Sequence, residues 1–275
     1  MKKVLVLGKT GYIGTQFINE LKYRNLSYRA ISRVDIDYCD YSHLYTLLTT
    51  DCYRAFDLVI NCAGYVGKPN VDVCEKNKEE TIKGNIVLPK MISDICSDLS
   101  INFMHISSGC IYTGYDKQYT EEDPPNFCFD SEIKGSFYSG TKALAEDLIN
   151  KNNSYVCRLR IPFDEFDSPR NYISKLINYD KLLDMENSIS HRGDFVKACL
   201  DLYEKNCPKG IYNVTNTGSV TTRWVAEKMK EFNIKCNFDF FDNEQTFYKF
   251  GAKAPRSNCL LDNSKLTSAG VKIRT

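Results

Sequence analysis

The chain begins with a short apolar run that leads directly into a glycine-rich turn. Lys2–Gly8 reads KKVLVLG, and the glycines that follow give the pattern GxxGxxG at the start of an amphipathic stretch, Tyr12–Asn25. Glycines at a strand-to-helix turn permit a tight bend and a close approach of the backbone to a pyrophosphate. The first N–H groups of the helix attract phosphate charge. We therefore expect a dinucleotide pyrophosphate against Gly8, Thr10, Gly11, Tyr12, Ile13 and Gly14.

Apolar runs and amphipathic stretches alternate through the first half of the chain. Further strands are predicted at Ser27–Arg33, Phe56–Gly64, Ile101–Ser108 and Ser154–Ile161, and further helices at Asp40–Thr49, Glu79–Leu99 and Tyr138–Asn150. This alternation predicts βαβ units and an α/β fold with a doubly wound, Rossmann-type parallel sheet.

After Pro162 the alternation weakens, and the sequence predicts a smaller α+β region. Its expected elements are two helices at 171–178 and 219–232, a short strand at 210–214 and a loop at 255–259. We therefore expect residues 1–161 to form a nucleotide-binding domain that carries the catalytic residues, and residues 162–275 to form a smaller region for the substrate.

Charge and cysteine usage exclude several classes of protein. The 36 basic and 35 acidic residues leave a net charge of +1, and no basic stripe indicates a nucleic-acid partner. No apolar run approaches the ~20 residues of a membrane span, and the first strand begins too near Met1 for a signal peptide. The 12 cysteines form no CxxC pair and only three histidines occur, so we expect no metal site. The pattern indicates reduced thiols in a cytoplasmic protein.

The end of the second predicted strand bears on the choice of cofactor. A basic residue at this place accommodates the 2′-phosphate of NADP, whereas an acidic one accepts a hydrogen bond from the ribose of NAD. Arg33, assisted by Ser32, favours NADPH, although Asp35 two residues later favours NADH. Asp37 is expected at the adenine edge.

A tyrosine and a lysine stand four residues apart in the segment YSGTK, so Tyr138 and Lys142 share one face of a helix. A neighbouring ammonium is expected to lower the pKa of the tyrosine and make it a usable acid/base. Together with the glycine turn, the segment NCAG at 61–64 and Ser108 after a strand, this set resembles the extended short-chain dehydrogenase/reductase family.

The resemblance implies roles for these residues. Ser108 would be the catalytic hydroxyl, with Ser107 as its rival, and Tyr138 the proton donor. Lys142 would grip the nicotinamide ribose, beside which Tyr138 also lies. The loop after the third strand would line the cofactor with Cys62, Ala63 and Gly64.

A closer resemblance within that family is carried by the segments GKTGYIG, CAGYVGKPNVDVCE, GCIY, EEDPPNF, GSFYSGTKA, PRNYISK and APRSN. They are similar to the nucleotide-rhamnose synthases, which are 3,5-epimerases/4-reductases. The resemblance implies NADPH-dependent conversion of UDP-4-keto-6-deoxyglucose to UDP-L-rhamnose, with a separate 4,6-dehydratase supplying the substrate. A homodimer is a further expectation. Expected substrate contacts are Asn70, Asp72, Ser108, Asn171 and Arg256, with Glu121 in a solvated loop nearby.

Cys110 stands two residues after Ser108, where epimerase/reductases of this family place a catalytic cysteine. Both C3 and C5 of a 4-ketohexose are acidified by the carbonyl, and inversion needs a base on one face and an acid on the other. The resemblance assigns Cys110 as the base and Lys175 as the acid. The alternatives are a buried apolar role for Cys110, and His191 as the acid.

Two other functions stay open from the sequence. One is reduction alone, on an already epimerised dTDP- or UDP-linked 4-keto sugar. The other is a non-catalytic NADP-binding regulatory subunit, although such proteins usually lose the tyrosine or the lysine, and both remain here.

Overall fold

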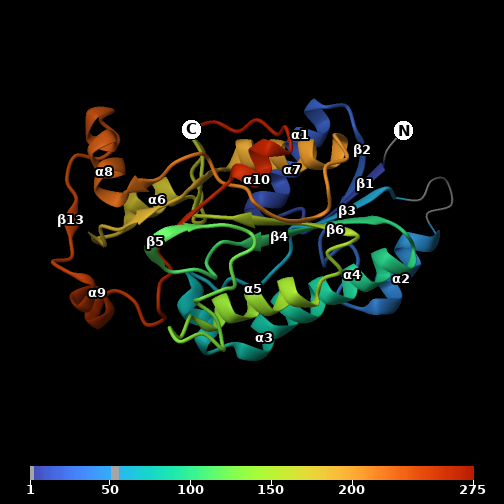
Figure 1. Cartoon of the computed structure of the whole chain (residues 1–275), viewed down its shortest axis with the longest axis horizontal. Helices are drawn as coiled ribbons and strands as arrows, with labels where there is room; N and C mark the ends of the chain where they lie inside the picture. Colours follow the sequence, from blue (N-terminus) through green and yellow to red (C-terminus); the bar gives the residue numbers. More distant parts are fainter. Residues whose placement is uncertain (1–2, 51–55) are drawn as a thin grey trace.

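A six-stranded parallel sheet forms the centre of the molecule (Figure 1). The computed structural model describes residues 3–50 and 56–275, so Lys2 of the first predicted strand lies outside the described residues. The strands run in the order β11-β6-β4-β3-β1-β2, and this doubly wound α/β sheet confirms the predicted fold class. Their bounds are β1 Lys3–Leu7, β2 Ser27–Ile31, β3 Leu58–Asn61, β4 Asn102–Ser108, β6 Ser154–Leu159 and β11 Gly210–Asn213.

The strand order reverses at β1, which pairs with β2 on one side and with β3 on the other. Ligands of open α/β sheets bind outside the carboxyl ends of the strands at such a switch point. The glycine turn follows β1 and the NCAG segment extends β3, so both lie at this place.

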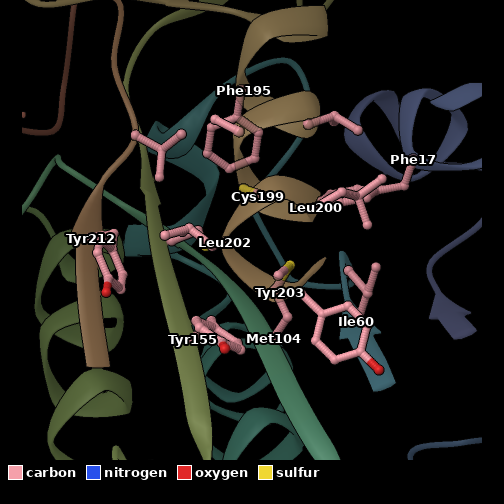
Figure 2. Close-up of a cluster of buried hydrophobic side chains, with 14 of the residues drawn as sticks. Phe17, Ile60, Met104, Tyr155, Phe195, Cys199, Leu200, Leu202, Tyr203 and Tyr212 are labelled. Atoms are coloured by element: carbon pink, nitrogen blue, oxygen red, sulfur yellow. The ribbon is translucent and has the colours of Figure 1, made fainter. Parts of the chain in front are cut away.

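Helices cover both faces of the sheet. On one face α1 (Tyr12–Tyr23) and α7 (Arg192–Glu204) pack together, and Figure 2 shows Phe17 of α1 and Phe195 of α7 in one apolar cluster with strand residues such as Ile60. On the other face lie α2 (Tyr41–Thr50), α4 (Leu88–Asp98) and α5 (Phe137–Leu148). Fully buried strands between two helical layers explain the unbroken apolar runs of the sequence.

The single helix predicted at 79–99 is built as three consecutive helical segments. α3 (Lys78–Ile82) passes through a π-helical turn, η2 (Lys83–Val87), into α4. Asn85 in that turn is buried, and its side chain accepts from Tyr65 N at 2.7 Å and donates to Tyr65 O at 2.8 Å. The irregular turn therefore fixes the segment that follows β3, at the switch point of the sheet.

The second half combines small paired elements with a return to the main sheet. β11 joins that sheet beside β6, and α7 packs on its face, so the sheet has no break at residue 161. The predicted division of the chain at that residue stays a prediction. The remaining elements are η1 Val71–Glu75, β5 Gly114–Tyr119, β7 Pro162–Phe163, α6 Tyr172–Asn178, β8 Lys181–Leu182, β9 Glu186–Asn187, β10 Ser190–His191, β12 Val220–Thr221, α8 Thr222–Glu231, β13 Asp239–Phe240, α9 Glu244–Phe250, β14 Cys259–Leu261 and α10 Ser264–Ser268.

Two expectations for loops were wrong. The predicted loop at 255–259 ends in a strand, because Cys259 begins β14 and pairs with β5. Glu121 is not solvated: it is 9% exposed, and its carboxylate accepts from Asn213 N at 2.6 Å. Burial raises the pKa of Glu121, although the hydrogen bond from Asn213 opposes that effect.

Neither a membrane span nor a metal cluster is found in residues 3–50 and 56–275. Within these ranges no helix has the length and apolar character needed to cross a bilayer. The same residues hold no group of three or more His, Cys, Asp and Glu side chains that could bind a metal ion. Every cysteine in the described part of the chain is a free thiol.

Candidate active site

The glycine turn after β1 is tightly packed against the chain itself. Gly8 has a φ of +85°, which favours glycine, and a Cβ at Gly14 would lie 2.2 Å from the carbonyl oxygen of Gly8. Gly11 caps α1 without a side chain, and the first turn of the helix contains no acidic residue. The positive end of the helix is thus left for an external anion, so the turn fits a dinucleotide pyrophosphate.

The segment after β2 brings the predicted cofactor-selecting residues together. Arg33 is exposed, while Asp35 accepts from Ser32 Oγ at 2.6 Å and from Lys9 Nζ at 2.9 Å. These hydrogen bonds, from Lys9 first, hold the pKa of Asp35 well below its usual range. Asp35 is therefore a carboxylate already matched by Lys9, and Arg33 is the exposed cation at this edge. Asp37 accepts from Cys39 N at 3.2 Å, and its predicted place at the adenine stays a prediction.

The segment after β3 is fixed by amide side chains. Asn61 is buried and accepts from Ala63 N at 3.0 Å. A Cβ at Gly64 would lie 3.1 Å from Oδ1 of Asn85, so this bend is held closely against the π-helical turn. Burial raises the pKa of the Cys62 thiol, which packs against the apolar cluster of Figure 2. Cys62 to Gly64 therefore form a rigid edge beside the glycine turn.

The two serines at the end of β4 have different partners. Ser107 donates to Oε1 of Glu146 at 2.5 Å, and Glu146 is in turn held by Arg158 at 2.8 Å. Ser108 instead accepts from Cys110 N at 3.2 Å, and a hydrogen bond with Ser108 lowers the pKa of Tyr138. The geometry thus favours Ser108 as the hydroxyl that faces the site.

Tyr138 and Lys142 lie on one face of α5, but the expected effect of the lysine on the tyrosine was wrong. Burial raises the pKa of Tyr138, and negative charge on Cys110 would raise it further, against the hydrogen bond with Ser108. The ammonium group of Lys142 is engaged elsewhere, by Ile106 O at 3.0 Å and His105 Nε2 at 3.2 Å. Without bound cofactor, the site therefore holds Tyr138 as a protonated phenol.

His105 is a buried partner of Lys142 that the sequence analysis missed. It is 1% exposed, and its other ring nitrogen lies 3.3 Å from Nδ2 of Asn61. Burial, followed by the nearby charge of Lys142, lowers the pKa of His105 well below its ordinary value. A neutral imidazole thus lies beneath the lysine and fixes the place of its nitrogen.

Burial lowers the pKa of Lys142 to about 8, so the ammonium destabilises the folded state near neutral pH. Lys142→Met should therefore stabilise the cofactor-free protein at pH 7, by about 1–2 kcal/mol once lost hydrogen bonds are subtracted. The gain should shrink as pH rises from about 8 toward 10.5, because the folded lysine then loses its proton before the unfolded one. Urea unfolding of both proteins across this range measures the difference, and a gain that does not change with pH would contradict the assignment.

Cys110 lies within electrostatic reach of several site residues. It is half-buried, and its charge would shift the pKa of Tyr138, of Lys142 and of Lys175. Burial lowers the pKa of Lys175, and the positive charge of Arg170 lowers it further. Ser108 at the end of β4 and Cys110 just after it therefore lie close to Tyr138 of α5, and Lys175 of α6 is within electrostatic range of Cys110.

The predicted substrate contacts are partly engaged with one another. Arg256 forms an ion pair with Asp72 at 2.8 Å, and Asp72 also accepts from Ala254 N at 2.9 Å. Burial opposes but does not cancel the effect of Arg256, which lowers the pKa of Asp72. Asn70 accepts from Asp72 N and caps η1. The positive charge of Arg256 also lowers the pKa of Lys175, which indicates that the Asp72–Arg256 pair lies near that lysine.

Asn171 and His191 have structural partners. Asn171 is buried and caps α6, and its amide nitrogen donates to Asp164 O at 2.8 Å and to Phe166 O at 2.7 Å. A contact between Asn171 and a substrate therefore stays a prediction. His191 caps α7 by accepting from Asp194 N, which is a structural role.

Asp164 is a second residue that the sequence analysis missed. It accepts from Tyr12 Oη at 2.8 Å and pairs with Arg192 at 2.5 Å, and the guanidinium group of Arg192 lies 4.3 Å above the ring of Tyr12. This trio fastens the glycine turn to the start of α7. The sequence indicated Asp164 only by its position in a polar segment before a buried helix.

Nearly the whole chain matches a family model. The model of the RmlD substrate binding domain matches residues 1–274. The chain belongs to this family. A bifunctional dTDP-4-dehydrorhamnose 3,5-epimerase/dTDP-4-dehydrorhamnose reductase of Arabidopsis thaliana is 32% identical, over 95% of this chain and 85% of the relative.

A second curated relative is longer. A trifunctional UDP-glucose 4,6-dehydratase/UDP-4-keto-6-deoxy-D-glucose 3,5-epimerase/UDP-4-keto-L-rhamnose-reductase of the same plant is 32% identical over 96% of this chain. The chain spans 39% of that relative. The match confirms the predicted family, which the sequence segments had indicated.

Solved structures show the same fold. The UDP-rhamnose synthase of Acanthamoeba polyphaga mimivirus superposes with a TM-score of 0.87 at 24% identity, over 99% of this chain and 94% of that one. A dTDP-4-dehydrorhamnose reductase of Bacillus anthracis in complex with NADP has a TM-score of 0.83 at 19% identity, covering 100% of this chain and 95% of that one. At these identities the structures establish the architecture, and the chemistry must be argued from this chain's own residues.

Proposed function

We propose that this protein is an NADPH-dependent 3,5-epimerase/4-reductase that converts UDP-4-keto-6-deoxy-D-glucose to UDP-L-rhamnose. The observation that carries the proposal is the meeting of two sets of groups in one site. Ser108 and Tyr138 can serve a carbonyl, while Cys110 and Lys175 can serve carbons next to it. The curated relatives named for both chemistries cover nearly the whole chain and support the assignment.

In the reductive half, Ser108 and Tyr138 hold the C4 carbonyl oxygen by hydrogen bonds. NADPH, when bound along the glycine turn, supplies the hydride. Tyr138 gives its proton to the developing alkoxide, and a raised pKa keeps that proton available until the charge appears. Lys142, whose ammonium is held by His105 and Ile106 O, would contact the nicotinamide ribose.

In the epimerising half, the sulfur of Cys110 removes the proton from a carbon next to the ketone. The electron pair of the broken C–H bond passes into an enolate at the C4 oxygen, which Ser108 and Tyr138 can stabilise. Lys175 then protonates the carbon from the other face, and the lowered pKa of its ammonium makes it a better donor. Solvent returns a proton to Lys175 and removes one from Cys110.

The test uses the purified protein with UDP-4-keto-6-deoxyglucose and NADPH, and NMR identifies the product sugar. UDP-L-rhamnose is the expected product. A 6-deoxy sugar that keeps the configuration at C3 and C5 would contradict epimerisation and leave the reductase-only alternative. Unchanged NADPH with either the substrate or a pre-epimerised 4-keto sugar would favour the regulatory-subunit alternative. A parallel assay with the dTDP-linked substrate distinguishes the nucleotide.

Arg33→Ala should weaken NADPH far more than NADH. The variant loses a charge-assisted contact to the 2′-phosphate, worth roughly 1.5–3 kcal/mol, or about 10- to 150-fold in the dissociation constant. NADH has no 2′-phosphate for Arg33 to contact, and the carboxylate of Asp35 is already paired with Lys9, so the affinity for NADH should change little. Fluorescence titration of both cofactors measures the ratio, and equal losses would show that Arg33 does not contact the phosphate.

Several associated expectations remain part of the proposal. A 4,6-dehydratase must supply the 4-keto sugar, because neither half of the proposed reaction forms that ketone from a sugar alcohol. The homodimer and the cytoplasmic location stay predictions from the sequence and its resemblance.

A further inference from the structure

Arg160 is a buried cation that contacts Cys110. It lies directly after β6, is 1% exposed, and its Nη1 lies 3.2 Å from the sulfur of Cys110. The guanidinium group also donates to Ser257 Oγ at 2.9 Å, to Ser257 O at 2.7 Å and to Oδ1 of Asn187. Among the described residues none of these partners is a carboxylate, and Nε has no partner.

A second buried arginine nearby, in contrast, has a carboxylate partner. Arg158, two residues earlier and within β6, forms a bidentate pair with Glu146 at 2.8–3.2 Å. A buried charge without a counter-ion is strongly unfavourable. Arg160 therefore needs a negative group, and among the described residues its hydrogen-bond partners include no aspartate or glutamate.

The backbone after Arg160 is strained. Ile161 has a φ of +38°, a conformation that a β-branched residue rarely adopts, and Pro162 follows it. Backbone strain of this kind persists only where the surrounding structure stabilises it, and it is found most often at functional sites. Here it lies between Arg160 and the segment that leads to Asp164.

The other ionisable groups near Cys110 are weaker partners for a negative sulfur. Tyr138 and Cys259 both have a pKa raised first by burial, so they stay neutral, and Cys259 donates to Gly109 O. Lys142 and Lys175 are cations with a pKa lowered by burial. Arg160 keeps its positive charge at every working pH.

We infer that Arg160 is a positioning residue that holds Cys110 in the thiolate form, the form able to take a proton from carbon. The inference rests on the proposed function, because it deepens the role given there to Cys110. It also explains why buried arginines lie both in β6 and directly after it, although among the described residues only Arg158 of the two pairs with a carboxylate.

The test follows the alkylation of Cys110 by iodoacetamide in the full-length, substrate-free protein. Mass spectrometry of the Cys110 peptide gives its rate from about pH 6 to about pH 9.5, with exposed Cys236 as the reference in the same sample. Arg160→Gln should slow Cys110 about tenfold or more at pH 7 relative to Cys236, and should move its profile to higher pH. Arg160→Lys should recover part of the rate.

Ser257→Ala is the matched control, because it removes an anchor of Arg160 and keeps the charge. Its Cys110 profile should stay near that of the wild type. Thermal melting and reduction of a pre-epimerised 4-keto sugar verify that each variant is folded. If Arg160→Gln does not fold, the comparison of Arg160→Lys with wild type decides, since the shorter side chain and single ammonium of lysine should still slow alkylation.

A wild-type Cys110 profile in a folded Arg160→Gln variant would overturn the inference. A folded variant with slow alkylation supports it even if no epimerase activity is ever found, because the alkylation needs neither substrate nor cofactor. In that case the proposed function fails while the inference about the thiolate holds.

Discussion

Tyr138→Phe should lower carbonyl reduction by about 10²–10⁴-fold, the usual contribution of a positioned proton donor. Tyr138 faces Ser108 and keeps its proton, because burial raises its pKa. Phenylalanine preserves the ring and its packing on α5, so the fold and cofactor binding should change little. Stopped-flow oxidation of NADPH with a pre-epimerised 4-keto sugar measures the step without interference from epimerisation.

The two serines at the end of β4 provide a matched control for this variant. Ser108→Ala should also impair reduction, whereas Ser107→Ala should leave it nearly unchanged, because Ser107 donates to the buried Glu146. If Tyr138→Phe kept near-normal turnover while Ser108→Ala lost reduction as expected, Tyr138 would not be the proton donor.

The first half of the fold was predictable because local signals agree with the tertiary structure. Buried strands appear as apolar runs, helices show their spacing, and the glycine turn lies between β1 and α1. Predicted bounds for β2 and α5 differ from the observed ones by one or two residues, which is the usual fraying of element ends.

The second half was less predictable, since its strands are short and pair over long sequence distances. Several strands have two residues each, and β5 pairs with β14 more than a hundred residues later. The helix α7 was missed although its polar residues recur at helical spacing, at positions 194, 197, 201 and 204, beside buried side chains such as Phe195 and Leu200.

In the site, motifs predicted which residues come together but not their partners. Spacing placed Tyr138 and Lys142 on one helical face, yet it gave no sign that His105 holds the lysine. The expectation of a lowered tyrosine pKa failed because burial raises the pKa of Tyr138. The pairing of Asp72 with Arg256 likewise depends on the tertiary fold.

Arg160 had a signal that the sequence analysis did not use. Arg158 and Arg160 occupy alternate positions of a predicted strand that is mostly apolar. A charged side chain in a buried strand is unfavourable unless it has a partner. Sequence alone does not tell which arginine has a carboxylate and which faces a thiol, because both partners come from other elements.

Cys110→Ala should abolish exchange of deuterium into C3 and C5 of the 4-keto substrate in D2O, a loss of about 10²–10⁴-fold for a general base. Cys110 is the proposed base, and alanine leaves no sulfur beside Arg160 to take the proton. Ser108, Tyr138 and Lys142 stay in place, so the variant should still reduce a pre-epimerised 4-keto sugar. NMR of the substrate in D2O, without NADPH, measures exchange apart from reduction.

Lys175→Ala separates the two faces of the same reaction. Its inversion should be lost, while some exchange remains, because Cys110 can remove and return a proton on one face before an acid is needed on the other. The two variants together therefore distinguish base from acid in a single deuterium assay. Wild-type exchange in a folded Cys110→Ala variant would leave the cysteine as an apolar residue of the site and return the protein to reduction alone.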